Sequence, residues 1–376
     1  MKVRIERDKL ADAVAWAMRG LSSSRIGGNN TIGIEAGVGT LTLVAYDRDT
    51  SAQAEADAAV DVPGSVIVPG KLLAEITKTL PSSAVQLSVV DGSLRVECGK
   101  SSFDIPLVTV GDFPHMLEVP GLLGTINGGQ LATALGQVVI AAASNDTLSN
   151  LSGIHFEFNK SHITLAATDR YRLALRDVEW SPATTDVNAS AFIPAIKVND
   201  IAKGLADCSS VNISLSTKGD NSLVGFSGDN RTIATTLLNA KFPNYRDSIP
   251  APGDITAYID NNVLAAALRR VRLVLEERDK SFVSMELGTN EVILTARGQS
   301  SGVATETIDA VITGKTEEAV RFDPFRFTEG LSATNSPWVK LSFINKSKPV
   351  LLTAAKEAGK DIEDGYKYWL MPKLYN

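Results

Sequence analysis

An α+β fold, built from three tandem copies of one domain, is predicted by sequence motifs that recur in the same order at nearly constant spacing. The first motif, Leu41–Asp47 (LTLVAYD), returns as Ile163–Asp169 (ITLAATD) and, more weakly, as Val292–Gly298 (VILTARG), at offsets of 122 and 129 residues. A chance match would not keep its phase over such distances. The period is domain-sized and far longer than a solenoid repeat, which favours triplication of a whole domain.

Two further motifs keep the same phase. One places a proline after a short apolar strand, at Pro69, Pro194 and Pro324. The other is an apolar residue followed by proline near the end of each copy, at Phe113-Pro114, Phe242-Pro243 and Met371-Pro372. Proline and glycine interrupt the periodic sequence at residues 119–121 and 249–253, which is typical of connections between domains. We therefore predict domains over residues 1–121, 122–251 and 252–376.

Within each copy the apolar spacing predicts a strand, a helix, several strands, a second helix and further strands. In the first copy, residues 4–6 alternate, helical spacing follows from Leu10 to Leu21, and residues 40–45 alternate again. The corresponding helices are expected over 127–145 and 261–280, the second helices over 71–80, 197–205 and 324–331, and typical strands over 85–90, 211–215 and 338–343. Each domain should therefore contain two helices packed on mostly antiparallel sheets of about eight short strands.

The composition indicates a protein located in a reducing compartment. The chain has 376 residues, of which 44% are apolar, so each copy can bury a core. Its two cysteines, Cys98 and Cys208, form no CxxC pair. The start, Met1–Arg7, has no apolar signal core, and no run reaches the 18 apolar residues of a membrane span. We expect a soluble, cytoplasmic protein without a membrane partner.

Catalytic and metal-binding signatures are weak. The sequence Cys98-Gly-Lys-Ser101 resembles the end of a phosphate-binding loop, but Leu94 stands where that motif requires glycine, so a turn between strands is the better interpretation. The histidines, at positions 115, 155 and 162, have no metal-ligand spacing. Asp47 and Asp169 occupy equivalent positions at strand ends, where turn capping is favoured over paired catalytic carboxylates. We predict no active site, no metal and no cofactor.

Basic residues concentrate on the predicted helices, although the net charge is −6. Arg269 and Arg272 are spaced i,i+3 and share a helix face, while the apolar residues of that helix point elsewhere. Further basic residues flank the helices of the first two copies, at Arg7, Lys9, Arg19, Arg25, Lys197 and Lys203. A solvated helix face also explains these charges. The stretch 127–145 has no charged residue at all, which argues against a uniformly basic surface.

Four segments resemble the bacterial DNA sliding clamp family, the β subunits of DNA polymerase III, and the resemblance extends over the whole chain. They are Met1–Arg7 (MKVRIER), Ala167–Ala174 (ATDRYRLA), Lys241–Arg246 (KFPNYR) and Tyr368–Pro372 (YWLMP). The family implies a head-to-tail homodimer that forms a six-domain ring, with helices lining the hole and sheets outside. Weak contacts to phosphates would let such a ring slide along duplex DNA.

The resemblance implies three sets of functional residues. Candidates that face DNA are Arg25, Lys197, Lys203, Arg269, Arg270 and Arg272. The dimer interface is expected to join an edge strand around Phe103 and Ile105 to the region of Val274 and Leu275 in the second subunit. A pocket for short peptides from the polymerase α subunit, the clamp loader and other partners would be formed by Leu151, Thr168, Arg170, Tyr171, Arg172, Leu173, Pro243, Arg246, Phe282, Ser347, Pro349, Trp369, Leu370, Met371 and Pro372.

The chain departs from the usual family pattern near that pocket. Arg170 stands where glycine or serine is frequent, Asp247 follows Arg246 where a basic residue is often found, and residues 373–376 change and extend the usual end. These changes are compatible with a second-copy clamp altered against an inhibitor that binds the pocket. Two functions of other classes remain as alternatives, an enzyme acting at DNA ends and a monomeric β-rich interaction scaffold. The first would need clustered carboxylates or a nucleophilic lysine motif, which do not occur, and the second would not need to form a closed dimer.

Overall fold

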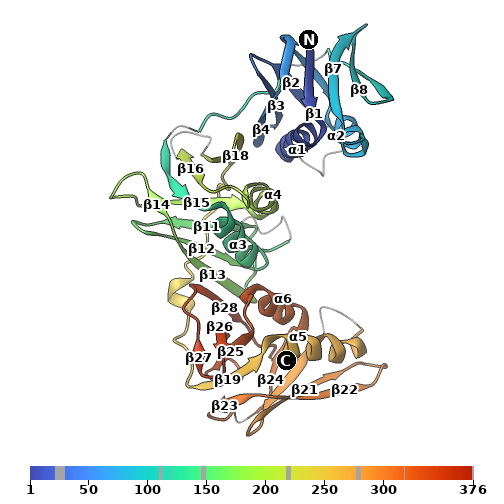
Figure 1. The fold of residues 1–376 in the computed structure, drawn as a ribbon. Helices are drawn as coiled ribbons and strands as arrows, with labels where there is room; N and C mark the ends of the chain where they lie inside the picture. The colour runs from blue at the N-terminus through green and yellow to red at the C-terminus, as the bar shows by residue number, and fades with distance from the viewer. Residues whose placement is uncertain are drawn as a thin grey trace. The chain divides into compact units, whose positions relative to one another are not determined.

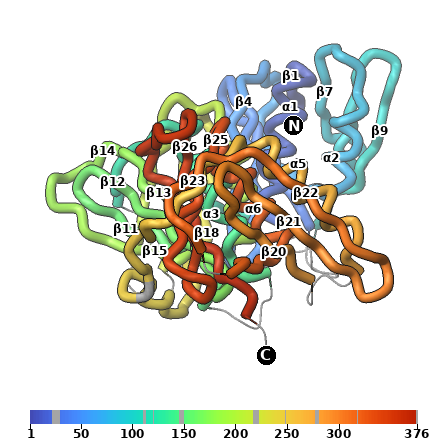
Figure 2. The backbone as a smooth tube through the Cα atoms, turned by 90° about the horizontal axis from the view of Figure 1, so that it is seen from below, coloured from blue at the N-terminus to red at the C-terminus, as the bar shows by residue number. Residues whose placement is uncertain are grey.

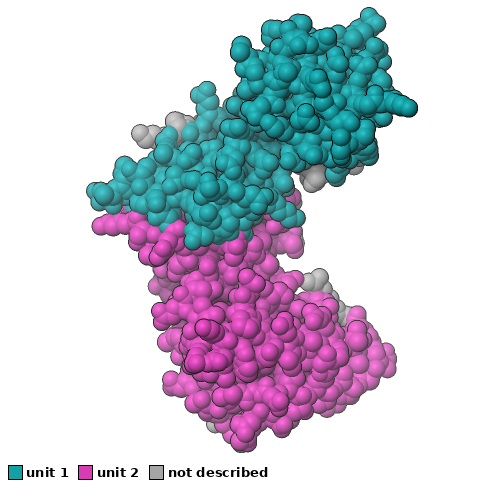
Figure 3. Space-filling view, viewed as in Figure 1, with its two compact units in different colours: residues 1–132, 180–187, 200–237 teal, residues 133–179, 188–199, 238–376 magenta. Residues whose placement is uncertain are grey.

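The computed structural model describes residues 1–21, 30–109, 113–119, 121–144, 150–216, 222–276, 281–316 and 318–374. Figure 1 follows the chain through these segments. By internal contacts they form two compact units, which Figure 3 colours separately. Unit 1 comprises residues 1–132, 180–187 and 200–237, and unit 2 comprises residues 133–179, 188–199 and 238–376. Because both units contain parts of the second copy, the predicted domain limits stay a proposal.

The first copy contains two helices and the first nine strands. The helices are α1 (Arg7–Ala17), extended by a 3-10 turn (Met18–Gly20), and α2 (Gly70–Thr79). The strands are β1 (Lys2–Glu6), β2 (Thr31–Ala36), β3 (Thr40–Asp47), β4 (Thr50–Asp57), β5 (Ala59–Val62), β6 (Gly64–Pro69), β7 (Ala84–Val90), β8 (Ser93–Cys98) and β9 (Ser101–Pro106). Helices α1 and α2 pack against each other, side by side in Figure 1.

The second copy repeats this order. Its helices are α3 (Gly128–Val139) and α4 (Ala195–Leu205). Its strands are β10 (Leu122–Ile126), β11 (Gly153–Phe158), β12 (His162–Thr168), β13 (Arg172–Glu179), β14 (Ser181–Pro182), β15 (Ala189–Pro194), β16 (Val211–Ser216), β17 (Leu223–Gly228) and β18 (Arg231–Thr236). A 3-10 turn (Arg246–Ser248) precedes the third copy.

The third copy has helices α5 (Asn261–Val271), followed by a 3-10 turn (Arg272–Val274), and α6 (Pro324–Thr334). Its strands are β19 (Ile255–Asp260), β20 (Val283–Leu287), β21 (Glu291–Arg297), β22 (Val303–Asp309), β23 (Val311–Thr313), β24 (Val320–Phe322), β25 (Trp338–Phe343), β26 (Val350–Glu357), β27 (Lys360–Asp361) and β28 (Tyr366–Leu370). Strands β21 and β22 form the hairpin drawn in orange in Figure 2.

The repeated motifs fall on equivalent elements, as the triplication predicts. The first motif forms β3, β12 and β21, each the middle strand of an antiparallel set. The motif prolines stand at the start of the second helix of each copy: Pro69 precedes α2, Pro194 precedes α4 and Pro324 begins α6. Proline suits a helix start because its missing N–H has no intrahelical partner there.

Two of the sheets continue from one copy into the next, each through an equivalent pair of strands. The nine-stranded sheet of unit 1 has the order β14-β10-β16-β17-β18-β4-β3-β2-β6, and β18 of the second copy pairs with β4 of the first. The ten-stranded sheet of unit 2 has the order β15-β11-β12-β13-β28-β26-β25-β19-β23, and β28 of the third copy pairs with β13 of the second. We call these two strand pairs the unit 1 join and the unit 2 join.

Two smaller sheets end in strands that correspond to the ones used in the joins. The five-stranded sheet, β5-β1-β7-β8-β9, ends at β9, the counterpart of β18 and β28. The four-stranded sheet, β22-β21-β20-β24, ends at β22, the counterpart of β4 and β13. Within the described segments, therefore, β9 and β22 are free edges at the position where the other copies make a join.

The first helices are shorter than the apolar spacing predicts. Helix α3 ends at Val139, because Ala141 and Ala142 donate to Val138 and Val139 in tight turns and the N–H of Ala143 bonds to the carbonyl of Leu151 instead. Helix α5 likewise ends at Val271 in a 3-10 turn. Amphipathic spacing continues through such turns, so it overestimates helix length. Residue 145 and residues 277–280 of the predicted helices lie outside the described residues.

Candidate functional site

An apolar cavity lies in unit 2, beside the unit 2 join. It is a cavity of about 220 Å³ lined by Leu151, Thr168, Arg170, Arg172, Leu173, Pro243, Asn244, Tyr245, Ile249, Pro250, Pro349, Trp369 and Met371. Apart from Leu151, which precedes β11, these residues come from the β12–β13 hairpin, the segment 243–250, the position just before β26 and the end of β28 with the residue after it. Pairing of β13 with β28 brings the first and last of these together, and the N–H of Met371 donates to the carbonyl of Tyr171 at 2.8 Å.

An aromatic cluster supports one wall of the cavity. Phe242 and Tyr245 pack with Ala166 and Phe192 in the buried core, and Leu173 and Ile249 pack against this group. The ring of His155 stacks on Phe242, with centroids 5.1 Å apart and ring planes inclined by 6°. The Tyr245 hydroxyl donates to Glu157 Oε1 at 3.3 Å, and burial raises the pKa of Tyr245. The wall is therefore preformed by packing within unit 2.

The hairpin turn between β12 and β13 is held by one carboxylate. Asp169 Oδ1 accepts from the backbone N–H groups of Tyr171 and Arg172, at 2.9 and 3.1 Å, which is the turn capping that the sequence predicts. Asp169 Oδ2 accepts from the Nε atoms of both Arg172 and Arg326, each at 3.1 Å. Asp169 is therefore a structural group whose acceptor positions are occupied by the fold.

Arg172 is the buried charge at this site. Its side chain is 10% exposed and also donates to the carboxylate of Glu329 on α6. Burial by itself would lower the pKa of Arg172, but Tyr368, Glu329 and Asp169 together raise it. A buried guanidinium with two carboxylate partners contributes chiefly to holding α6 against the hairpin, because its donors are already used.

Arg170 differs from Arg172 in both backbone and surroundings. Its φ is +78°, in the left-handed region that costs a non-glycine residue roughly 1–2 kcal/mol. Its N–H donates to the hydroxyl of Thr168 at 3.2 Å, and its side chain is exposed on the cavity wall. The equivalent turn of the first copy also has an arginine at positive φ, Arg48.

Several residues predicted for the pocket are not among those that line this cavity. Tyr171 is exposed with the Arg326 guanidinium over its ring at 4.7 Å, and Arg246 pairs with Glu157. Phe282 lies beneath Arg321, Ser347 is in an exposed turn, and Leu370 and Pro372 are buried. The sequence interpretation missed Asn244, Tyr245, Ile249 and Pro250, although the first two lie within the Lys241–Arg246 segment that indicated the pocket and the last two follow it closely.

The candidate DNA-facing residues differ in how far their charges are already compensated. Arg270 pairs with Glu306 of β22, Nη2 to Oε2 at 2.6 Å, and Arg272 lies over the ring of Phe325 at 5.1 Å. Arg269 is exposed and borders a polar cavity of about 400 Å³ with Asn261, Asn262, Ser332 and Asn335. On α4, Lys203 is exposed and Lys197 is half-buried. Arg25 lies outside the described residues.

The expected dimer residues lie on the two free edges or next to them. Phe103 on β9 is 37% exposed, whereas Ile105 on the same strand is buried in the core of its own sheet. Val274 and Leu275 are half-buried, and the sequence interpretation missed their neighbour Leu273, which is 80% exposed. Leu273 therefore adds an exposed apolar side chain directly beside Val274 and Leu275.

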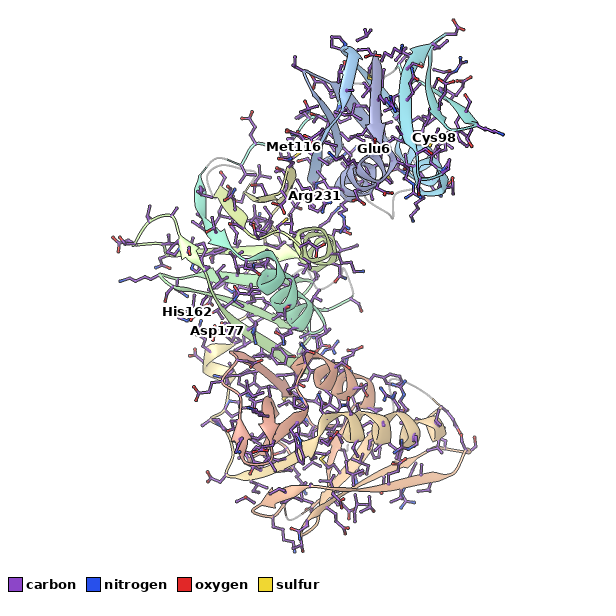
Figure 4. The ribbon with its side chains drawn as sticks, viewed as in Figure 1. Glu6, Cys98, Met116, His162, Asp177 and Arg231 are labelled. Atoms are coloured by element: carbon purple, nitrogen blue, oxygen red, sulfur yellow. The ribbon has the colours of Figure 1, made fainter. Side chains whose placement is uncertain are left out.

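The remaining chemical motifs have structural explanations. Gly99 forms the turn of the β8–β9 hairpin at φ +61°, so the sequence CGKS is a connection between strands. His162, labelled in Figure 4 with Asp177, lies on β12 next to β13, and its Nδ1 is 2.8 Å from the Ser161 hydroxyl. Within the described ranges, no group of three or more metal-ligating side chains is arranged to hold an ion. Among the helices that the structure describes, none has the length and apolar character needed to cross a membrane.

Comparisons with known proteins agree on one family. Residues 1–117, 125–244 and 246–367 match the family models of the N-terminal, central and C-terminal domains of the DNA polymerase III beta subunit. The chain is 36% identical to the beta sliding clamp of Streptomyces coelicolor over 99% of each chain, and 30% identical to the beta sliding clamp homolog GriR of Streptomyces muensis over 100% of each. The sliding clamp of Pseudomonas aeruginosa bound to griselimycin superposes over 100% of both chains with a TM-score of 0.88 at 21% identity. The chain belongs to the family of bacterial beta sliding clamps, the beta subunits of DNA polymerase III.

Proposed function

We propose that this clamp subunit closes as a head-to-tail homodimer around duplex DNA in the cytoplasm and acts as a processivity factor without an active site of its own. The observation that carries the proposal is the pair of free edges. Strands equivalent to β9 and β22 pair with each other in both joins, so β9 of one subunit and β22 of a second would complete a third join of the same kind. Two such pairings would close a six-domain ring and cover every one of these edges.

Sedimentation tests the dimer. At micromolar concentration the protein should sediment at about twice its mass of 40.0 kDa. Leu273→Asp should weaken dimerisation roughly tenfold to a hundredfold, because a charge would enter an apolar contact beside Val274 and Leu275. Val38→Asp is a matched control, since Val38 is fully exposed in the β2–β3 turn. A strictly monomeric species would instead support the scaffold interpretation.

Topology on DNA tests the ring. Protein loaded by a clamp loader should remain on circular DNA and leave when the circle is linearised. Direct binding should be weak, with log K falling by about 0.9 per phosphate contact for each unit of log salt. Reversing the charges of Arg269 and Arg272 should reduce loading while the fold is retained, and Arg297→Glu, on an exposed strand position, is the control. Equal retention on circular and linear DNA would reject encirclement.

The cavity in unit 2 is proposed to bind short peptides from the polymerase α subunit, the clamp loader and other partners. Its apolar wall and few polar groups suit a partly hydrophobic peptide that carries a glutamine and ends in a Leu-Phe pair. Met371→Ala removes a wall residue and should weaken binding by about 1–3 kcal/mol in calorimetry. Leu374→Ala, an exposed residue that does not line the cavity, should leave affinity unchanged. Equal affinity of the two variants would place the peptide elsewhere.

A second-copy clamp that resists an inhibitor is the alternative, and two comparisons are consistent with it. The relative GriR is matched over its full length, and griselimycin is bound by the clamp of Pseudomonas aeruginosa. If this chain is such a variant, calorimetry should show much weaker binding of griselimycin than of a partner peptide. Tight binding of griselimycin would favour a housekeeping role.

A further inference from the structure

Among the residues that the structure describes, the wall of the unit 2 cavity carries positive charge only. These lining residues include two arginines, Arg170 and Arg172, and no aspartate or glutamate. Arg172 is compensated by Asp169 and Glu329. The Arg170 guanidinium makes no hydrogen bond or ion pair with any residue that the structure describes. Arg170 is therefore the cation that the cavity offers to a ligand.

The neighbouring carboxylates are already engaged. Asp169 accepts from two backbone N–H groups and from two guanidinium groups. Asp247, beyond the wall residue Asn244, accepts from the Asn244 side chain at 2.6 Å. Glu157 pairs with Arg246 and accepts from Tyr245. None of these groups is positioned by the fold to neutralise Arg170.

The backbone conformation of Arg170 also supports a role in ligand binding. A residue at φ +78° is best served by glycine, and the turn is held by Asp169 and Thr168 without help from the arginine side chain. The fold therefore gains nothing visible from a long charged side chain at this strained position. A strained residue whose side chain is unused by the fold and faces a cavity indicates a role in binding.

We propose that Arg170 is a specificity-determining residue that selects peptides bearing a carboxylate beside their apolar anchors. The inference rests on the proposed peptide-binding function of the cavity. In the bound state the carboxylate would pair with the Arg170 guanidinium at the rim, while the apolar side chains occupy the wall formed by residues such as Leu173, Trp369 and Met371. Planar, two-pronged donation from a guanidinium suits a carboxylate better than an amide.

The test uses the full-length protein and two peptides that differ by one group. Each peptide carries a glutamine and a Leu-Phe end, and one intervening residue is aspartate in the first and asparagine in the second; the pair is made for each intervening position. With the unchanged protein, calorimetry should show a preference for aspartate of about twofold to fivefold at low salt at one of these positions. The preference should shrink in 1 M salt, where screening acts over roughly 3 Å.

Variants separate the charge from the backbone. Arg170→Gln should remove the preference for aspartate, and Arg170→Lys should retain part of it. Arg297→Gln removes an exposed charge away from the cavity and should leave the preference intact. Arg170→Gly should also remove the preference while the melting temperature stays the same or rises, because it relieves the left-handed conformation. A fall in melting temperature with the preference retained would show that Arg170 is structural.

Charge exchange completes the test. Arg170→Glu should invert the selection, so that a peptide with lysine at the sensitive position binds more tightly than one with aspartate. Equal affinity of the unchanged protein for all aspartate and asparagine peptides would overturn this inference while leaving peptide binding in place. Absence of binding by every peptide would overturn the proposed function of the cavity and the inference together.

Discussion

The two joins have the same strand pairing but different interiors. In the unit 1 join, Trp16 of α1 donates from Nε1 to the carbonyl of Gln53 at 2.7 Å and packs on Gly204, where an added Cβ would lie 1.9 Å from the ring. In the unit 2 join the corresponding place between helices is taken by Gln137, which donates to the carbonyl of Ala333 at 2.8 Å. The unit 1 join is therefore packed around an aromatic side chain, whereas the unit 2 join is bridged by a hydrogen bond from a side-chain amide.

The strands themselves show the same contrast. Thr50 begins β4 in the unit 1 join, is buried, and shares a hydrogen bond of 3.1 Å with the hydroxyl of Thr235. Its counterpart Arg172 begins β13 and pairs with Asp169 and Glu329 beside the cavity. A repeated backbone therefore supports a neutral, compact contact in one place and a charged contact beside a cavity in the other. Side chains at equivalent positions, not topology, make the difference.

Removing the Trp16 side chain should have the largest effect on stability. Trp16→Ala would leave a void beside Gly204 and take away the ring over which Arg19 and Arg231, the latter labelled in Figure 4, are placed. We expect unit 1 to lose about 3–5 kcal/mol of stability in urea denaturation. A variant as stable as the unchanged protein would mean that the strand pairing alone holds this join.

Breaking the charged contact of the other join should come next. Arg172→Met keeps an unbranched apolar stem but removes the ion pair with Glu329, while Asp169 retains Arg326. We expect unit 2 to lose roughly 3 kcal/mol, the lower end for disruption of a buried ion pair. Lys346→Met is the matched control, because Lys346 pairs with Glu318 on an exposed surface of unit 2, where a loss of under about 1 kcal/mol is expected. Similar losses for both would remove the distinction between the two contacts.

The hydrogen bond between Thr50 and Thr235 in the unit 1 join should contribute less to stability than the ion pairs of Arg172. Thr50→Val and Thr235→Val each leave one buried hydroxyl without its partner hydroxyl and should each cost about 1 kcal/mol. The double variant should cost less than the sum of the two, because both hydroxyls are then gone. Denaturant titration of the three variants gives the coupling directly, and strict additivity would show that the hydroxyls do not interact.

The smallest effect concerns pH. His155 of unit 2 stacks on Phe242, whereas its counterpart in unit 1, Gly33, lies directly against Phe113. Burial, opposed by Glu157 and aided by Arg246, lowers the pKa of His155 from its ordinary 6.5. The unfolded chain therefore binds the proton first as pH falls below about 6.5, and stability is lost there with a slope of at most about 1.4 kcal/mol per pH unit until the folded-state pKa is reached.

His155→Phe isolates this effect. The variant keeps an aromatic ring against Phe242, and His155 Nδ1 has no hydrogen-bond partner in the described residues that would be lost. The loss of unit 2 stability between pH 6.5 and lower values should be reduced relative to the unchanged protein. An identical pH dependence of the two proteins would mean that other groups titrate in this range.

The triplication, the fold class and the family could be predicted from the sequence, because they depend on local sequence patterns. Apolar spacing located all six described helices, and the recurring prolines marked the start of α2, α4 and α6. The segments Ala167–Ala174, Lys241–Arg246 and Tyr368–Pro372 indicated the cavity, and residues from each of them line it. Helix ends were less predictable, because whether the last turn of α3 continues depends on a bond from Ala143 to Leu151, which comes later in the chain.

Tertiary structure decided what those residues can do. Arg170 and Arg172 are two residues apart in the sequence and have the same formal charge. The fold brings the carboxylates of Asp169 and Glu329 to Arg172, whereas Arg170 lies on the cavity wall without them. The same holds for Ile105, buried in its own sheet, and Leu273, exposed beyond α5. A side chain's chemical type is written in the sequence, but its charge compensation and exposure depend on residues distant along the chain, because these are brought beside it only when the strands pair.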